Sequence, residues 1–338
     1  MSISFAPSTW LIYYCYIVGA VSFVLNVLVI LIIIFKSYKI VEFQYMLLAF
    51  QISCTNYVLQ LTILSQPMSL FPILAGHCEG FLASYFGIWS HYLITLILVS
   101  AIVEAQILIG CVVFKHQAIA QVLNKHVVSK KIRLLRKSSY VFVPGSAFLT
   151  FLQGSTRRED QLKFIESRYP KYLSEFKNLS NFAIYQFNIW HVFLAIVGVI
   201  GGMFCAITGV YTTVDIFKML QEVQTKVSSS SFQRYQSAIR SLVSQMFASL
   251  MLFVPLFIFV MLITGVDNGQ FIGELLQSIC ALQSIVNAVV LIFTTPSYRN
   301  FVLRQLPQSR IFGSSRTNTN FRIQTPGISA PPRIITTL

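Results

Sequence analysis

Two histidines and two glutamates lie inside long apolar stretches, where an ionisable side chain needs a partner or a water-filled cavity. His91, His191 and Glu274 fall near the ends of their stretches, each close to aromatic or amide side chains. This mixture of groups is typical of a site that binds a small molecule, although each residue alone could be interfacial or hydrogen-bonded. The predicted ligand-binding residues are Trp89, His91, Thr95, Trp190, His191, Glu274 and Gln277.

Three further residues lie deeper in the apolar stretches and are candidates for a buried polar switch. Glu104 has two interpretations, because a buried carboxyl can stay neutral and simply hydrogen-bond, or can change state between two conformations. Asn287 belongs to a polar stripe, which should face the interior of a helix bundle. Pro255 predicts a kink about which a helix can pivot.

Seven apolar stretches must position these residues, and most are long enough to cross a hydrocarbon core of about 30 Å. Each should be a helix, because backbone polar groups in lipid must bond internally. Of the 338 residues, 55% are hydrophobic and 11% are charged, which excludes an ordinary soluble protein. We predict an all-α membrane protein with a seven-transmembrane helix bundle over residues 10–295. The stretches are 10–35, 43–65, 86–114, 138–153, 189–213, 241–264 and 271–295.

The positions of Lys and Arg predict the orientation of the bundle. The formal net charge of +14 could suggest nucleic acid, but no cation lies inside a long apolar stretch, which is a membrane pattern. With an outer N-terminus and seven spans, 19 of the 25 cations lie inside and 6 outside. Without the short fourth span, which contains Pro144 and Gly145, the distribution would be 15 against 10. The charges therefore predict seven spans, an extracellular N-terminus and a cytosolic C-terminus.

The segments outside the bilayer have distinct predicted roles. Residues 1–9 are the extracellular N-terminus, and 154–188 form a long second extracellular loop with its own helix, whose aromatic side chains either roof a pocket or only cover helix ends. Asn178 begins an Asn-x-Ser sequon and is a predicted glycosylation site. Residues 296–307 predict a juxtamembrane amphipathic helix, and 308–338 a disordered cytosolic tail.

Basic residues on the inner side have two interpretations. The segment 115–137 contains seven cations and no acid. It can be a topology signal that also attracts anionic membrane lipid, or a docking face for a cytoplasmic partner. The predicted partner-facing residues are Lys130, Lys131, Arg133, Arg234 and Arg240.

Gly198 and Gly202 form a Gly-x-x-x-Gly pattern in the fifth stretch. Small residues at this spacing allow another helix to approach closely. Packing within the bundle is the ordinary interpretation, and a dimer interface is the alternative.

Several other function classes lack support in the sequence. There is no His-Glu-x-x-His, phosphate-binding loop, Gly-x-Ser-x-Gly or Cys-x-x-Cys, so we expect neither an enzyme nor a metal or cofactor. No span contains the lysine that a retinal pump needs, and internal repeats typical of a transporter are not found. The Asp/Glu-Arg-Tyr and Asn-Pro-x-x-Tyr signatures of rhodopsin-like receptors are also missing. A divergent seven-helix receptor remains, with a ligand-gated channel or a small-molecule transporter as the alternative.

Several short segments together are similar to one receptor family. They are FKSYKI at 35–40, FQISCT at 50–55, QP at 66–67, LFPI at 70–73, Gly76, KHQAIA at 115–120, LSNF at 179–182, YQSAIRSL at 235–242 and PSYR at 296–299. Over most of residues 10–305 the chain resembles the nematode serpentine chemoreceptors, class I of the Str-related superfamily, with class H as a near neighbour. The resemblance implies a G-protein-coupled olfactory receptor on sensory-neuron cilia that detects an environmental small molecule and activates a heterotrimeric G protein. It supplies no ligand-contacting residues.

Overall fold

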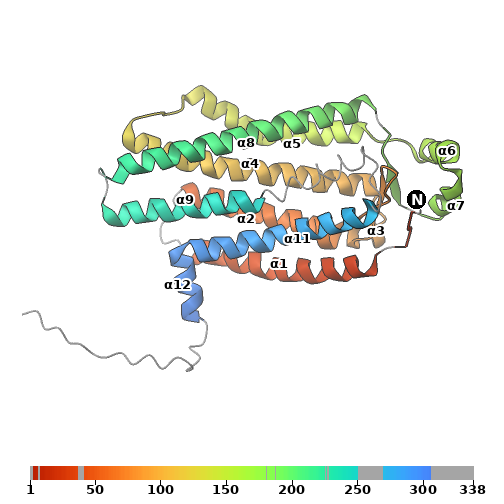
Figure 1. The fold of residues 1–338 in the computed structure, drawn as a ribbon, viewed down its shortest axis with the longest axis horizontal. Helices are drawn as coiled ribbons and strands as arrows, with labels where there is room; N and C mark the ends of the chain where they lie inside the picture. Colours follow the sequence, from red (N-terminus) through yellow and green to blue (C-terminus); the bar gives the residue numbers. More distant parts are fainter. Residues whose placement is uncertain are drawn as a thin grey trace, which may run out of the picture.

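Seven long helices run side by side and form one elongated bundle in the computed structural model (Figure 1). The structure describes residues 3–6, 8–36, 42–179, 181–186, 188–224, 226, 228–249 and 269–305. The seven helices are α1 (Thr9–Lys36), α2 (Glu42–Leu59), α4 (Ser90–Leu123), α5 (Lys130–Gln153), α8 (Ile189–Gln224), α9 (Ser229–Ser249) and α11 (Gly269–Thr294). The predicted kink at Pro255 and the predicted tail 308–338 lie outside the described residues.

Five of the described helices are long and apolar enough to cross a membrane. These are α1, α2 with its π-helical continuation η1 (Gln60–Leu64), α4, α8 and α11. Two further helices, α5 and α9, lie beside these five. The first turn of α5 contains Lys and Arg, and α9 as described ends at Ser249, so it includes only the beginning of the sixth apolar stretch, 241–264. The prediction of an all-α membrane protein is confirmed.

Helix α4 occupies the centre of the bundle, where it contacts α2, α5, α8 and α9. Helix α1 contacts α2 and α11, and α11 also contacts α9. In contrast, only 6% of the most apolar window of α8 is buried within the protein. Lipid must therefore cover most of the apolar surface of α8.

Three helices extend beyond the apolar stretches at the end of the bundle where α1 ends, which the charge pattern makes the inner end. α4 continues to Leu123 and α8 to Gln224, and α5 already begins at Lys130. These extensions contain Lys, Gln and Ala, which are good helix formers in water. Hydropathy therefore marks where lipid contact ends rather than where the helix ends.

The outer end carries a separate cap. A three-stranded antiparallel sheet in the order β1-β2-β3 joins the loop after η1 to the long second extracellular loop. Its apolar core includes Ile3, Ile165 and Phe176, so the N-terminal segment and the loop helices share one core. The strands are β1 (Pro67–Ser69), β2 (Ala75–Cys78) and β3 (Phe182–Ile184), and the short helices are α3 (Phe81–Ser84), α6 (Arg158–Arg168), η2 (Pro170–Tyr172) and α7 (Leu173–Asn178).

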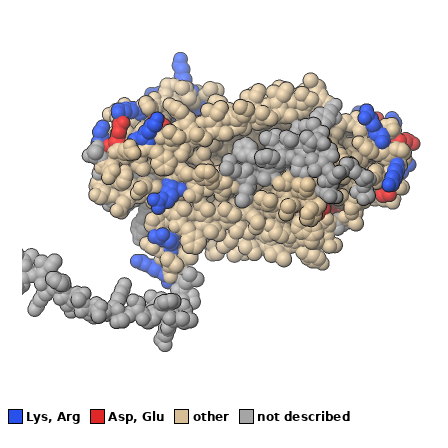
Figure 2. Space-filling view, in the orientation of Figure 1, with Lys and Arg blue, Asp and Glu red and all other residues tan. Residues whose placement is uncertain are grey.

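Helix α12 (Pro296–Gln305) follows α11 at the inner end and turns away from the bundle axis (Figure 1). Its Tyr298 is buried in a cluster with Ile33 of α1 and Leu291 of α11. Figure 2 shows that charged side chains on the visible face gather toward the two ends of the molecule. This distribution is the one expected of a protein whose middle section lies in lipid.

Candidate functional site

Four rings from four segments pack together at the outer end of the bundle. His91 lies on α4, Phe151 near the end of α5, Tyr185 directly after β3 and His191 near the start of α8. His91 stacks on Phe151 with ring centroids 5.1 Å apart, and the Tyr185 ring lies 5.5 Å from the His191 ring. The structure therefore brings two predicted ligand-binding residues together and adds Phe151 and Tyr185. We call these four residues the outer ring cluster.

The two histidines of this cluster have ring nitrogens without a hydrogen-bond partner. Nε2 of His91 and both ring nitrogens of His191 are buried and make no hydrogen bond to the described residues. The backbone of Leu152 and of Gln186 lies near these rings, but outside normal hydrogen-bond geometry. His91 Nδ1 lies 3.3 Å from the Tyr185 hydroxyl. Because unpartnered buried nitrogens are costly, they are available to a ligand that can hydrogen-bond.

The other predicted residues of α4 and α8 have different surroundings. Trp89 borders the outer ring cluster, with its ring 5.1 Å from the His91 ring, and its Nε1 donates to the carbonyl of Phe182 at 2.9 Å. The Thr95 hydroxyl donates to the carbonyl of His91 at 2.6 Å and is thus committed to its own helix. Trp190 is 44% exposed at the rim of the bundle.

Glu274 and Gln277 form a second group at the start of α11. The Ser8 hydroxyl donates to Glu274 Oε1 at 2.5 Å, so this carboxyl holds the N-terminal segment. Gln277 Nε2 is buried and makes no hydrogen bond to the described residues. No hydrogen bond or ring contact among those residues links Glu274 to the outer ring cluster. The structure therefore divides the predicted ligand-binding residues into two groups.

Hydrogen bonds tie the start of α4 to the long second extracellular loop. Asn181 Oδ1 accepts from the backbone N–H of Ser90 at 2.8 Å, and Asn181 Nδ2 donates to the carbonyl of Ile88 at 2.5 Å. The Ser90 hydroxyl donates to the Asn181 carbonyl at 2.8 Å and accepts from the backbone N–H of Cys78 at 3.0 Å. All six cysteines are free, so this attachment contains no disulfide.

Glu104 lies fully buried at the centre of the bundle and joins three helices. Its Oε1 accepts from Gln283 Nε2 of α11 at 2.5 Å and from the Cys54 thiol of α2 at 3.2 Å. Its Oε2 has no hydrogen-bond partner among the described residues, and no cation there lies against the carboxyl. Asn287 is also buried, and its Nδ2 donates to the Ser249 hydroxyl of α9 at 3.4 Å. Both predicted switch residues that the structure describes therefore sit between helices.

Sequence reasoning missed other members of this buried polar layer. Asn26 of α1 donates to the Ser284 hydroxyl at 2.7 Å and accepts from the Gln51 amide. Asn26 stands in an otherwise apolar run, whereas Gln283 directly precedes Ser284. An amide in such a run is itself a signal of an interhelical hydrogen bond, although it carries no charge.

The basic residues predicted to face a partner lie at the inner end. Lys130, Lys131 and Arg133 are exposed on the first turn of α5, and Arg240 is exposed on α9. The side chain of Arg234 lies outside the described part of the chain. Among the described side chains, helix α5 thus presents three of these cations toward the cytosolic side and helix α9 presents one.

Gly198 lies on the lipid-facing surface of α8. A Cβ added there would have no neighbour within 4 Å among the described atoms, and Gly202 is half-buried. Packing within the bundle therefore does not explain Gly198.

Comparisons with known proteins agree with this architecture. The family model described as "Serpentine type 7TM GPCR chemoreceptor Sri" matches residues 1–302. Among solved structures, the chain is similar to squid rhodopsin, with 11% sequence identity, coverage of 88% of this chain and 84% of that chain, and a TM-score of 0.52. No curated protein matches the chain. At this identity the structural likeness shows the seven-transmembrane fold alone.

Proposed function

The chain belongs to the serpentine type 7TM GPCR chemoreceptor Sri family, and from this premise we propose where its ligand and its G protein bind. It is a G-protein-coupled chemoreceptor with a seven-transmembrane fold, and the family does not favour the channel or transporter alternative. An environmental small molecule binds at the outer ring cluster and biases an equilibrium between conformations of the inner end. The buried, unpartnered ring nitrogens of His91 and His191 carry this proposal.

The chemistry of the cluster suggests the class of ligand. Two imidazoles, a phenol and a phenyl ring offer apolar contact area together with a few hydrogen-bonding positions. No charged side chain of the described residues belongs to the outer ring cluster. We therefore expect a small, largely apolar molecule with one or two polar groups.

The ligand proposal is tested with a panel of volatile and water-soluble compounds applied to cells that express the receptor and a calcium reporter. His91→Ala should raise the half-maximal concentration of an active compound at least about tenfold, the effect of losing roughly 1.4 kcal/mol. Glu274→Gln should have a smaller effect, because Glu274 holds the N-terminal segment instead. Phe204→Leu, on the exposed surface of α8, is the control. Unchanged responses in both His91→Ala and His191→Ala would remove the cluster from the ligand site.

The G protein is proposed to contact the basic inner ends of α5 and α9. Charge reversal at Lys130, Lys131 and Arg133 should reduce coupling while surface expression stays intact, since all three side chains are exposed. The same reversal at Lys163, Lys171 and Lys177, which are exposed in the outer loop, is the control for altered net charge. Undiminished signalling in the triple variant would contradict the assignment.

Further predicted properties extend this proposal. We infer a plasma-membrane receptor of sensory-neuron cilia that belongs to class I of the Str-related superfamily. Asn178, which is exposed at the end of α7, is the proposed glycosylation site, and a mass shift lost in Asn178→Gln would demonstrate its use. Gly198 and Gly202 are proposed to allow dimerisation through the lipid-facing side of α8.

A further inference from the structure

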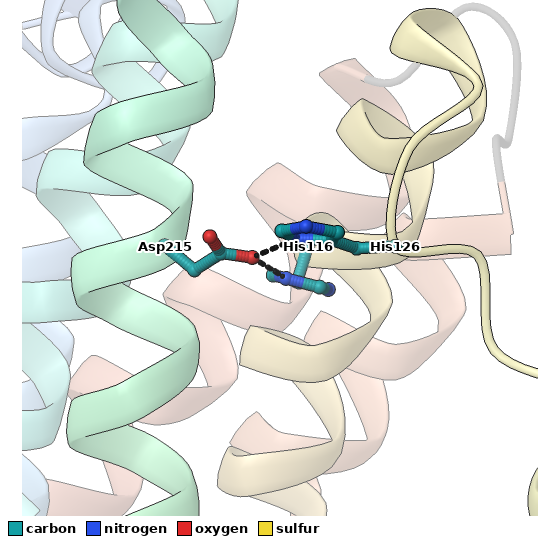
Figure 3. A group of neighbouring side chains, drawn as sticks. All are labelled: His116, His126 and Asp215. Atoms are coloured by element: carbon teal, nitrogen blue, oxygen red, sulfur yellow. Dashed lines mark hydrogen bonds and ion pairs between the residues drawn. The ribbon is translucent and has the colours of Figure 1, made fainter.

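Two histidines and one aspartate from three different segments converge at the inner end of the bundle (Figure 3). His116 lies on α4, His126 on the loop between α4 and α5, and Asp215 on α8. Asp215 Oδ2 lies 2.7 Å from His116 Nε2 and 3.0 Å from His126 Nδ1. One ligand atom of each residue lies within 4.8 Å of the other two. The three side chains are thus close enough to share one ion.

The local backbone directs His126 back onto the helices. Helix α4 ends at Leu123 and is followed by Asn124, whose φ of 53° is left-handed, and His126 itself has a φ of 55°. Left-handed backbone is uncommon for residues other than glycine, yet here it turns the loop so that the His126 ring reaches Asp215. His116 and Asp215 are largely buried, whereas the His126 side chain is 58% exposed. His116 and Asp215 are therefore held in place by their surroundings, and His126 lies on the solvent side of the group.

We propose that His116, His126 and Asp215 bind a divalent transition-metal ion of the zinc type. Imidazole nitrogen and carboxylate oxygen are ordinary Zn²⁺ ligands, and a site with three protein ligands keeps its fourth position for water. Tetrahedral coordination with bonds of about 2.1 Å separates ligand atoms by roughly 3.4 Å. The two separations from Asp215 Oδ2, 2.7 and 3.0 Å, are shorter than this, and the three ligand atoms lie within 4.8 Å of one another, so modest shifts of the side chains suffice. The metal takes the place of the protons that now lie between nitrogen and oxygen.

Gln117 determines which nitrogen of the His116 ring carries the proton. Gln117 Oε1 accepts from the backbone N–H of Val128 at 2.8 Å, and Gln117 Nε2 lies 3.0 Å from His116 Nδ1. In the metal-free arrangement His116 therefore carries its proton on Nε2. Metal on Nε2 moves the proton to Nδ1, which then needs an acceptor, as ligating histidines usually have. The amide must turn to supply one, and a glutamate at this position would supply it directly.

The test is a zinc titration of the purified full chain in lipid nanodiscs, read by calorimetry and by the thermal unfolding temperature. The wild type should bind one Zn²⁺ and unfold at a higher temperature when zinc is present, because the ion joins three segments. His126→Ala should weaken binding at least about tenfold, and Gln117→Glu should strengthen it by a similar factor. The zinc-free unfolding temperature of each variant shows that it folds.

The matched control is a His–carboxylate pair in the outer cap. His77 Nε2 lies 3.1 Å from Glu79 Oε1 in the outer cap, with no third ligand in its vicinity among the described residues. His77→Ala should leave the zinc titration unchanged. Equal zinc binding by wild type and His126→Ala, or loss of binding in His77→Ala alone, would overturn the proposal. Because the assay contains only zinc and the receptor, its outcome does not depend on the ligand or G-protein assignments.

Discussion

The two ends of the bundle are built in different ways. At the outer end, a sheet, three loop helices and the N-terminal segment share an apolar core, and packed rings lie directly beneath them. At the inner end, α4, α8 and α9 meet around a small apolar cavity, beside the polar group of His116, His126 and Asp215. The outer end is held together by strand pairing and loop packing, whereas the inner end combines a packed apolar core, with room for about one water molecule, and a polar group. The cavity is lined by Val112, Thr213, Ile216, Ile239, Leu242, Val243 and Met246.

The largest loss of stability should follow from a substitution at Gly80, in the outer end of the bundle. A Cβ at this position would lie 2.5 Å from backbone atoms of Leu64 and Ser65, which cannot rotate away. Gly80→Ala should cost roughly 3 kcal/mol or more of unfolding free energy and reduce surface expression strongly. Gly201→Ala is the control, because its added methyl meets nothing within 4 Å and alanine favours a helix. Normal expression of Gly80→Ala would show that the outer end is less rigid than we infer.

The next effect concerns the hydrogen bonds between α4 and the second extracellular loop. Asn181→Ala removes the acceptor of the Ser90 backbone N–H and the donor to the Ile88 carbonyl. We expect a loss of about 2 kcal/mol, measured as a lower unfolding temperature in nanodiscs. Glu166→Ala, on the exposed surface of α6, should change it little. Equal behaviour of the two variants would contradict a role for Asn181 in joining the loop to α4.

A moderate loss of stability is expected from substitutions at Glu104, which lies in the middle of the bundle. An ionised carboxylate without a cation partner is costly in a membrane interior, so we infer that this side chain is a neutral acid. Glu104→Gln should therefore retain the bonds from Gln283 and Cys54 and change the unfolding free energy by less than about 1 kcal/mol. Glu104→Ala should cost about 2 kcal/mol, because it leaves the Gln283 amide unpaired. If Glu104→Gln were as damaging as Glu104→Ala, the negative charge itself would be needed.

The smallest effect is chemical and concerns Cys78 in the outer cap. Burial raises the pKa of the Cys78 thiol to about 12, so it stays protonated at neutral pH and reacts slowly with maleimide. In the unfolded chain the thiol ionises near pH 8.5. The raised pKa therefore contributes stability below that pH, and this contribution is lost as the pH rises toward 12. Rapid labelling of native receptor at pH 7.5, compared with a Cys78→Ser control, would show an open cap.

Much of the fold could be predicted from the sequence because lipid imposes a simple rule. The lengths of the apolar stretches predict membrane-spanning helices, and the distribution of Lys and Arg predicts their orientation. Both predictions follow from the cost of placing polar groups in hydrocarbon. The outer sheet could not be predicted in the same way. Its strands contain three or four residues each, too few to show an alternating pattern.

The candidate site was predictable only in part. His91 and His191 stand out because ionisable groups are rare in apolar stretches, but Phe151 and Tyr185 do not, since aromatic residues are abundant throughout the chain. The inner cluster was missed for another reason. The predicted spans ended at residues 114 and 213, just before His116 and Asp215, so neither was considered part of a helix.

The length of α8 gives this arrangement a mechanical consequence. At 1.5 Å per residue, its 36 residues make a rod of about 54 Å. His191 stands near one tip, and Asp215 lies about 36 Å further along. If that rod pivots near its outer tip, a tilt of about 5° sweeps the opposite tip through roughly 5 Å by simple leverage. An atomic-scale displacement of the His191 ring is therefore magnified on the cytosolic side without any bending of the helix.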